Sequence, residues 1–202
     1  MPAGADITLP PPRHYSDVSL EETLLRIKSL RRYSPKPLTL PQLSQLLWAA
    51  QGIKNEAGKR TCPSAGATYP LEVYAVVGDV TDVPAGIYHY HPQSHSLKLI
   101  TLGDQRQALA EAASQRFMAT APASLVIAAV SERTAGRYGQ RAVRYIDMEA
   151  GHAAQNVGLQ AVALGLGTVV AGAFDDSRLA SLIRLDEETI PIYIIPVGGI
   201  PD

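Results

Sequence analysis

A short basic segment, Arg26-Ile-Lys-Ser-Leu-Arg-Arg32, places four cations within seven residues of a chain whose formal charge is only −1. Lys28, Ser29 and Arg31 can converge on a phosphate, because ammonium, hydroxyl and guanidinium groups all donate hydrogen bonds to its oxygens. The alternative is a solvated helix end whose cations complement the helix dipole. Spacing alone favours the helix end and leaves the phosphate site as a hypothesis.

A loop of small residues, Cys62-Pro-Ser-Ala-Gly-Ala-Thr-Tyr-Pro70, stands directly before a predicted strand. Such a loop exposes backbone N–H and C=O groups to a flat ligand such as a flavin ring, although a plain turn fits the same composition. Ser64 is not a candidate hydrolase nucleophile, because the Gly-x-Ser-x-Gly elbow is absent.

A second glycine-rich stretch, Leu164-Gly-Leu-Gly-Thr-Val-Val-Ala-Gly-Ala-Phe174, resembles a dinucleotide fingerprint only superficially. Val170 stands where the third glycine is required, and a helix precedes the strand, which reverses the order of that motif. We expect the glycines to cap a helix and to let the backbone at Ala171-Gly172 approach a ligand or another strand.

A basic and aromatic cluster leads into a long predicted helix; its members are Arg137, Tyr138, Arg141, Arg144 and Tyr145. Its cations can pair with nearby acids, an arrangement that contributes little to stability. The equal alternative is a loop that faces the substrate. The acids considered as partners are Asp147, Glu149 and Asp175.

Three histidines, His89, His91 and His95, have a spacing that can bind zinc, and the first two fall on one face of a predicted strand. No carboxylate or cysteine accompanies them in the sequence pattern, so we predict no metal site.

Composition describes an ordinary soluble protein, with 46% hydrophobic and 18% charged residues. The near-neutral charge gives no global attraction to nucleic acid or to an anionic membrane. A single cysteine, Cys62, excludes an intramolecular disulfide and suits a reducing compartment, so we expect a cytoplasmic protein. The apolar run Val157–Phe174 contains Gln160 and four glycines, which favours a buried helix and strand over a membrane span.

The chain is expected to form a Pro-rich, poorly ordered arm over residues 1–17 and one domain over residues 18–202. Capping boxes at Ser19-Leu-Glu-Glu22 and Thr39-Leu-Pro-Gln42 predict two helices, the first of which ends near Lys28. Further helices are predicted over 104–118, 141–164 and 177–183. Strands are predicted over 71–77, 86–90, 97–101, 124–130, 168–171 and 190–197, in a sheet of about five strands. Without regular βαβ alternation, this order favours an α+β fold.

Six segments occur together in an order and spacing that resemble the nitroreductase superfamily, and in particular its SagB-type dehydrogenase branch. They are Ser29–Pro35, Leu43–Gly52, Pro63–Tyr74, Gly86–Tyr90, Glu149–Asn156 and Gly165–Phe174. The resemblance implies a mostly antiparallel sheet flanked by helices, bound FMN, and a homodimer with two composite sites at its interface.

The resemblance also implies residue roles. It places Lys28, Ser29 and Arg31 at the FMN phosphate and ribityl chain, and it places a backbone N–H of Ala171 or Gly172 at flavin N5. The partner subunit's isoalloxazine would be contacted by Pro63, Ser64, Ala65 and Gly66. Substrate-side candidates are Arg137, Tyr138 and Arg141.

Three departures from the family pattern stand out. Ile27 occupies a position where the family often has Arg, and Pro196–Asp202 lacks the basic segment that many nitroreductases carry there. The same resemblance implies that azoline-oxidising members have a Lys-Tyr pair near the position of Arg137-Tyr138. An arginine, with a pKa above about 12, is a poor proton acceptor, which weakens a thiazole- or oxazole-forming role.

The resemblance therefore predicts an oxidoreductase that transfers hydride from NAD(P)H through flavin N5 to a small oxidised acceptor, such as a nitroaromatic or a quinone. No acid or base side chain is compulsory, because the flavin supplies the redox chemistry. Two alternatives stay open. One is an azoline dehydrogenase acting on a modified peptide, and the other is a flavin-binding protein without turnover.

Overall fold

A computed structural model describes residues 6–201. Its sheet has seven strands in the order β1-β4-β3-β2-β5-β7-β6, and each neighbouring pair is antiparallel. The strands are β1 (Ile7–Thr8), β2 (Leu71–Val77), β3 (Gly86–His91), β4 (Ser96–Leu102), β5 (Ala123–Val130), β6 (Leu166–Thr168) and β7 (Thr189–Gly199). The predicted antiparallel α+β architecture is confirmed, whereas the expected strand number of about five was too low.

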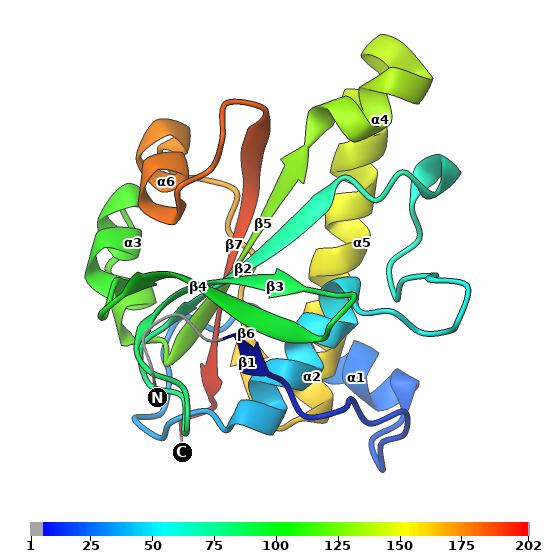
Figure 1. Ribbon diagram of the computed structural model, residues 1–202. Helices are drawn as coiled ribbons and strands as arrows, with labels where there is room; N and C mark the ends of the chain where they lie inside the picture. The colour runs from blue at the N-terminus through cyan, green and yellow to red at the C-terminus, as the bar shows by residue number, and fades with distance from the viewer. Residues whose placement is uncertain (1–5, 202) are drawn as a thin grey trace.

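Helices cover both faces of the sheet (Figure 1). One face carries α2 and the long α5, with α1 beside them, and the other carries α3 and α6. The helices are α1 (Leu20–Arg26), α2 (Leu40–Gln51), α3 (Arg106–Ala112), α4 (Ser131–Tyr138), α5 (Ala142–Ala163) and α6 (Asp176–Ile183). Among the helices of residues 6–201, none combines the length and apolarity that crossing a bilayer requires.

The central strands are buried on both sides, which explains their nearly continuous apolar sequence. Along β2, Leu71, Val73 and Ala75 belong to the core beneath α2 and α5, while Tyr74 and Val76 belong to the core beneath α3 and α6. This alternation follows from the two-residue period of a strand. Helices thus cover both faces of the sheet, and a ligand can reach the sheet only at its edges.

The two predicted capping boxes occupy helix N-termini in the structure. The Ser19 hydroxyl accepts from the N–H of Glu22, and at Thr39 both bonds of the box with Gln42 are present. α1 ends at Arg26, earlier than predicted, so Lys28 and the residues after it are not helical.

The predicted helix 104–118 is divided. α3 ends at Ala112, Ser114 takes a positive φ of 52°, and a separate 3-10 turn follows over Arg116–Thr120. The break was not visible in the sequence, because no glycine or proline marks it.

The described part of the Pro-rich arm is ordered, which corrects the expectation for these residues. Ile7 and Thr8 pair with Leu97 and Ser96 of β4. Further along, the N–H of Arg13 donates to Gln45 Oε1 over 2.8 Å, and the Ser44 hydroxyl donates to the carbonyl of Pro10 over 2.7 Å. Prolines lack an N–H but keep a carbonyl acceptor, so side chains of α2 can hold the arm.

Candidate functional site

The basic segment is extended and lies at the β6 edge of the sheet. Ser29 forms a parallel bridge with Thr168, and the N–H of Leu30 donates to the carbonyl of Thr168 over 2.9 Å. In extended backbone, alternate residues share a side. Ser29 and Arg31 therefore lie on one side, whereas Lys28 lies on the side of Leu30, whose side chain packs on Gly167.

The side chains of Lys28, Ser29 and Arg31 are exposed, and no salt bridge joins either cation to an acid within residues 6–201. Lys28 lines a cavity of about 410 Å³ beside the second half of α5. At the family position where Arg is common, Ile27 points its Cδ1 at Gly158 of α5. The small-residue face of α5 thus receives a side chain of the basic segment.

The Ala171-Gly172 backbone continues along the same edge, four residues beyond Thr168. The N–H of Ala171 donates to the carbonyl of Ile194 in β7, and the N–H of Ile194 donates to the carbonyl of Ala171, each over 2.9 Å. Gly172 is exposed, and within residues 6–201 its N–H has no acceptor. Of the two amides that the sequence singled out, only that of Gly172 is free to meet a ligand.

The loop Pro63–Tyr69 lies elsewhere, beside α4 and the first half of α5, and its backbone is strained. Gly66, Ala67 and Tyr69 have φ values of 60°, 54° and 46°, a conformation that costs free energy for residues other than glycine. Ser64 Oγ offsets part of this cost by accepting from the N–H of Tyr69 over 2.9 Å.

α4 holds this loop from outside. Arg137 donates to the carbonyl of Gly66 over 3.2 Å, Arg133 donates to the carbonyl of Tyr69 over 3.1 Å, and Thr134 shares a hydrogen bond with Thr68 over 2.9 Å. A side chain added at Gly66 would come within 2.6 Å of the Tyr138 hydroxyl. Arg137 and Tyr138 of the basic and aromatic cluster therefore lie on a helix that covers the loop, and the other members continue into a 3-10 turn and α5.

The acids expected to pair with that cluster do not do so. No salt bridge of residues 6–201 contains Arg141 or Arg144, and Glu149 is buried with only 3% exposure. Arg141 instead donates to the Tyr145 hydroxyl over 3.2 Å, and the Tyr138 and Tyr145 rings meet edge to face.

Glu149 lies behind the loop; in the sequence it was considered only as an ion-pair partner of the basic cluster. Cys62 Sγ donates to its backbone carbonyl over 3.4 Å, and its Oε1 has no hydrogen-bond partner within the described residues. Burial raises the pKa of Glu149 to about 7. The Ser64 hydroxyl and the Arg60 guanidinium act in the opposite direction, because they stabilise the carboxylate, but burial has the larger effect. Only tertiary packing reveals this group, because a glutamate in an amphipathic helix normally faces water.

Two of the three histidines are neighbours. The rings of His89 and His91 lie 4.6 Å apart, and His89 Nε2 lies 2.6 Å from Glu72 Oε2. Glu72 also forms a 2.5 Å ion pair with Arg133 of α4. Over residues 6–201, no group of three histidine, cysteine or acidic side chains is arranged to hold a metal ion. The cluster anchors α4 to the sheet.

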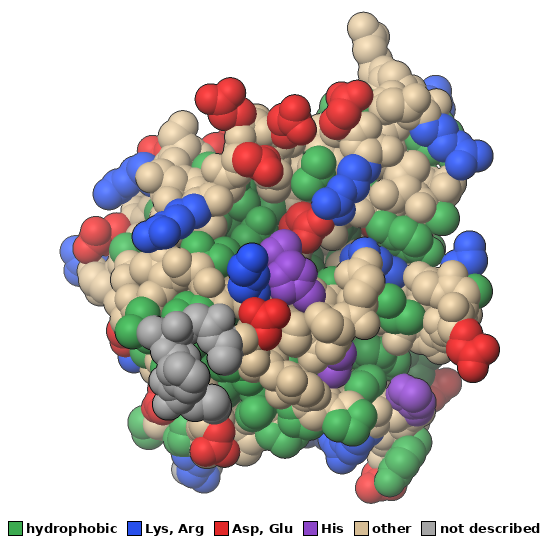
Figure 2. Space-filling model, viewed as in Figure 1, with side chains coloured by type: hydrophobic (Ala, Val, Ile, Leu, Met, Phe, Trp, Pro, Cys, Tyr) green, Lys and Arg blue, Asp and Glu red, His purple; other side chains and the backbone are tan. Residues whose placement is uncertain are grey.

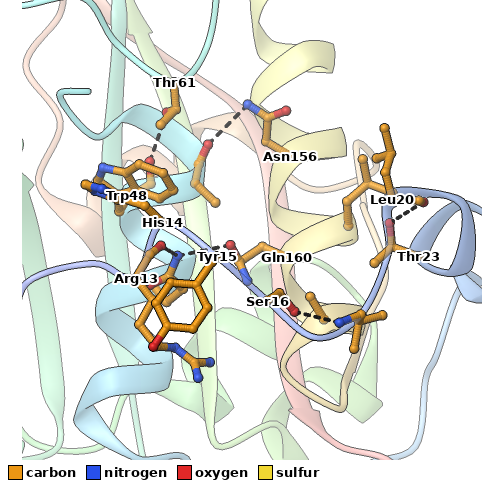
Figure 3. Close-up of a pocket in the computed structure, with 15 residues that line it drawn as sticks. Arg13, His14, Tyr15, Ser16, Leu20, Thr23, Trp48, Thr61, Asn156 and Gln160 are labelled. Atoms are coloured by element: carbon orange, nitrogen blue, oxygen red, sulfur yellow. Dashed lines mark hydrogen bonds between the residues drawn. The ribbon is translucent and has the colours of Figure 1, made fainter. Parts of the chain in front are cut away.

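On the face shown in Figure 2, acidic and basic side chains both occur. Figure 3 shows a cavity of about 360 Å³ between the arm, α2 and α5, where His14 stacks on Trp48 with 5.5 Å between ring centroids. None of the predicted site residues lines this cavity.

The single chain therefore brings the Ser29–Arg31 segment and Gly172 to one edge and keeps the Pro63–Gly66 loop apart from them. Residues 26–199 match the family model described as the nitroreductase family. The chain belongs to the nitroreductase family.

Individual relatives agree with that membership. A protein of Methanocaldococcus jannaschii that bears the name "Putative nitroreductase" is 48% identical over 90% of this chain and 91% of its own length. A crystal structure from Ralstonia eutropha, named in the same way, superimposes with a TM-score of 0.87 and 34% identity, covering 98% of this chain and 90% of the other.

A third relative is the microcin B17-processing protein McbC of Escherichia coli, 30% identical over 70% of this chain and 54% of its own length. This chain thus spans about half the length of McbC. Family members generally use flavin cofactors, and family membership identifies the protein as an oxidoreductase.

Proposed function

We propose that this protein binds FMN and transfers hydride from NAD(P)H to a small oxidised acceptor of the nitroaromatic or quinone type. One observation carries the proposal: the exposed Ser29–Arg31 pair and the free Gly172 amide lie on one edge of the sheet. From Thr168, which pairs with Ser29, to Gly172 the extended chain spans about 13 Å. An elongated cofactor with an anionic end can contact both.

The residues at this edge suit FMN chemically. Ser29 and Arg31 donate to the phosphate from one side of the extended segment, with Lys28 adding positive charge nearby. At Gly172, an added Cβ would meet nothing closer than Tyr193 at 3.5 Å, so the absence of a side chain there is not required by packing. An open approach to a backbone donor is what a flat ring needs.

We further propose that the site is completed in a homodimer, with Pro63, Ser64, Ala65 and Gly66 supplied by the partner subunit. Within one chain this loop adjoins Glu149 in the first half of α5, whereas the basic segment adjoins Gly158 in its second half. Exposed apolar side chains lie on the helices of the same face, namely Leu20, Leu24, Leu25, Val143 and Met148. Light scattering after size exclusion at micromolar concentration tests this; a monomer that retains FMN and activity would contradict it.

The bound flavin would supply the redox chemistry by accepting and donating hydride at N5. The residues of the chain would then bind the cofactor, orient it and exclude water from it. The Gly172 N–H directs a fixed dipole at the reacting ring, and Ser29 with Arg31 fixes its phosphate end. No residue has to act as a general acid or base.

A visible spectrum of the purified protein tests the proposal, followed by anaerobic titration with each nicotinamide. We expect a yellow protein that bleaches on reduction. A protein that is colourless and stays so after FMN is added would sink the proposal, and a yellow protein that oxidises neither nicotinamide would be a flavin-binding protein without turnover.

The double variant Ser29→Ala/Arg31→Ala should lose FMN, with a Kd at least about 100-fold higher, because two or more charge-assisted hydrogen bonds are lost. Arg32→Ala is the matched control, since Arg32 is also exposed but follows Arg31 on the alternate side of the chain. Retention of FMN by the double variant would place the phosphate elsewhere.

Peptide-azoline oxidation is the second candidate, favoured by the relationship to McbC. In that reaction a base beside the ring would assist proton removal, and the Tyr138 hydroxyl is the nearest candidate to the loop. Incubation with an azoline-containing peptide, followed by mass spectrometry, would show a loss of two mass units. Loss of that conversion in Tyr138→Phe, with nitroaromatic reduction retained, would favour this candidate.

A further inference from the structure

A cleft of about 510 Å³ opens beside the Pro63–Ala67 loop, and its charged lining is entirely basic. Lys54, Lys59, Arg60 and Arg137 contribute to it. No salt bridge joins any of these four cations to an acid within residues 6–201. In a chain with a net charge of −1, such a gathering is a local feature that attracts anions.

The cleft is held by backbone and side-chain contacts. Lys54 and Lys59 lie at the two ends of a turn that is closed by the bond from the N–H of Lys54 to the carbonyl of Lys59, 2.8 Å long. Arg60 is half-buried, donates to Gln51 Oε1 over 3.1 Å and lies 5.0 Å above the Tyr69 ring. Glu56, on the same turn, is exposed and does not line the cleft.

Arg60 is partly desolvated, and no salt bridge joins it to an acid within residues 6–201. Burial is the main cause that lowers the pKa of Arg60; Glu72 and Glu149 oppose that shift, and Arg133 adds to it. Its guanidinium remains charged at neutral pH, and a bound anion would compensate its desolvation.

We propose that this cleft receives the phosphates of the nicotinamide reductant and makes the enzyme selective for NADPH over NADH. The inference rests on the proposed function, in which the Pro63–Gly66 loop borders the flavin ring. A reductant stacked on that ring must extend past the loop, and its anionic parts then enter the basic cleft. The four positive charges of the cleft exceed the negative charge of the pyrophosphate, which NADH and NADPH share. The 2′-phosphate monoester, which only NADPH carries, adds about −1.5 to −2 charges at pH 7.

A binding measurement tests the site without turnover. Calorimetry with adenosine 2′,5′-bisphosphate and with adenosine 5′-monophosphate compares the two chemistries on the FMN-loaded protein. We expect the bisphosphate to bind at least about tenfold more tightly at low salt, and this preference to shrink as ionic strength rises. Equal affinities would overturn the proposal.

The variant Lys54→Ala/Lys59→Ala removes two cations whose side chains are exposed, so it should fold as the parent does. We expect its KM for NADPH to rise about tenfold with kcat unchanged, and its KM for NADH to change less than about threefold. The control Lys36→Ala/Lys98→Ala removes two exposed lysines outside the cleft and should leave both KM values unchanged.

The failures are distinguishable. A colourless protein would contradict the proposed function. A yellow, active enzyme whose KM for NADPH is unchanged in Lys54→Ala/Lys59→Ala would contradict only this inference. If the variant instead raises the KM of a carboxylate-bearing nitroaromatic and not that of NADPH, the cleft serves the acceptor and the proposal is wrong.

Discussion

The Ser29–Arg31 segment and the Pro63–Tyr69 loop both expose polar groups to a prospective ligand, but they are built in opposite ways. The basic segment is regular extended backbone beside β6, and its ligand-facing groups are exposed side chains. The loop has three residues of positive φ, and side chains from α4 hold its backbone in place. One region depends on local sequence, the other on distant residues.

This difference predicts which property a substitution in each region should change. Changes to the basic segment should alter ligand binding while leaving the fold intact, because the replaced side chains make few contacts within the chain. Changes behind the loop should alter stability and its pH dependence, because they touch buried groups. Three further predictions test that division.

The largest effect is expected from Glu149→Gln, which removes the buried ionisable group behind the loop. The folded-state pKa of Glu149 is raised from 4.5 to about 7, so the group destabilises the native state as pH rises through that interval. At about 1.36 kcal/mol per pKa unit, the variant should gain ~3 kcal/mol relative to wild type between pH 4 and pH 8. Urea unfolding at both pH values measures this difference.

The groups that face Glu149 support the interpretation. Cys62 stays a thiol because burial raises its pKa to about 12, and the Arg60 guanidinium favours the ionised form of Glu149. Asp147→Asn is the matched control, since Asp147 lies on the exposed side of the same helix. Identical pH slopes in wild type and Glu149→Gln would mean that the carboxyl is hydrated.

A smaller effect, about 1–3 kcal/mol, is expected from Glu72→Gln, which weakens the anchor between the sheet and α4. Arg133 and His89 both act on Glu72 and lower its pKa despite burial. Its contribution is therefore complete above the unfolded pKa and lost as pH falls through the lower folded value. Thermal melts at pH 7 should show a lower Tm, and the gap between variant and wild type should narrow at pH 3.

Limited proteolysis adds a local readout for Glu72→Gln. We expect cleavage after Arg137 or Arg141 to accelerate, because α4 opens more readily when Arg133 loses its charged partner. A variant with an unchanged Tm and unchanged cleavage at these sites would show that the Glu72 cluster does not hold α4.

The same division explains what the sequence could predict. Regular elements followed from local rules: β2 was predicted at the residues it occupies, and α5 within one residue at each end. The capping box at Thr39 is complete, and at Ser19 the bond from the Glu22 N–H to the serine side chain is present. The Ser29–Arg31 segment and the Gly172 backbone were singled out because unusual residue types cluster there. Their roles as ligand contacts stay predictions.

Features that depend on distant partners were missed. β1 forms because β4 offers an edge to Ile7 and Thr8, and α4 is helical although its sequence is mostly polar. The burial of Glu149 depends on Cys62 and Arg60, which are far from it in sequence. None of these has a local signature, because each arises from contacts that only the folded chain creates.

The smallest effect on stability is expected from Gly172→Ala, which tests the basic-segment edge by adding a single methyl group. Gly172 has no positive φ, and the new Cβ would meet Tyr193 at an ordinary 3.5 Å, so stability should change by less than about 0.5 kcal/mol. FMN affinity or turnover should nevertheless fall by about tenfold or more, because the methyl group occupies the approach to the free amide. Gly136→Ala on α4, where an added Cβ meets nothing within 4 Å, is the control and should retain both FMN affinity and turnover. A Gly172→Ala protein with normal FMN affinity and turnover would show that the flavin ring lies away from this backbone. The edge that contains the basic segment would then not be the ligand-binding region of the two.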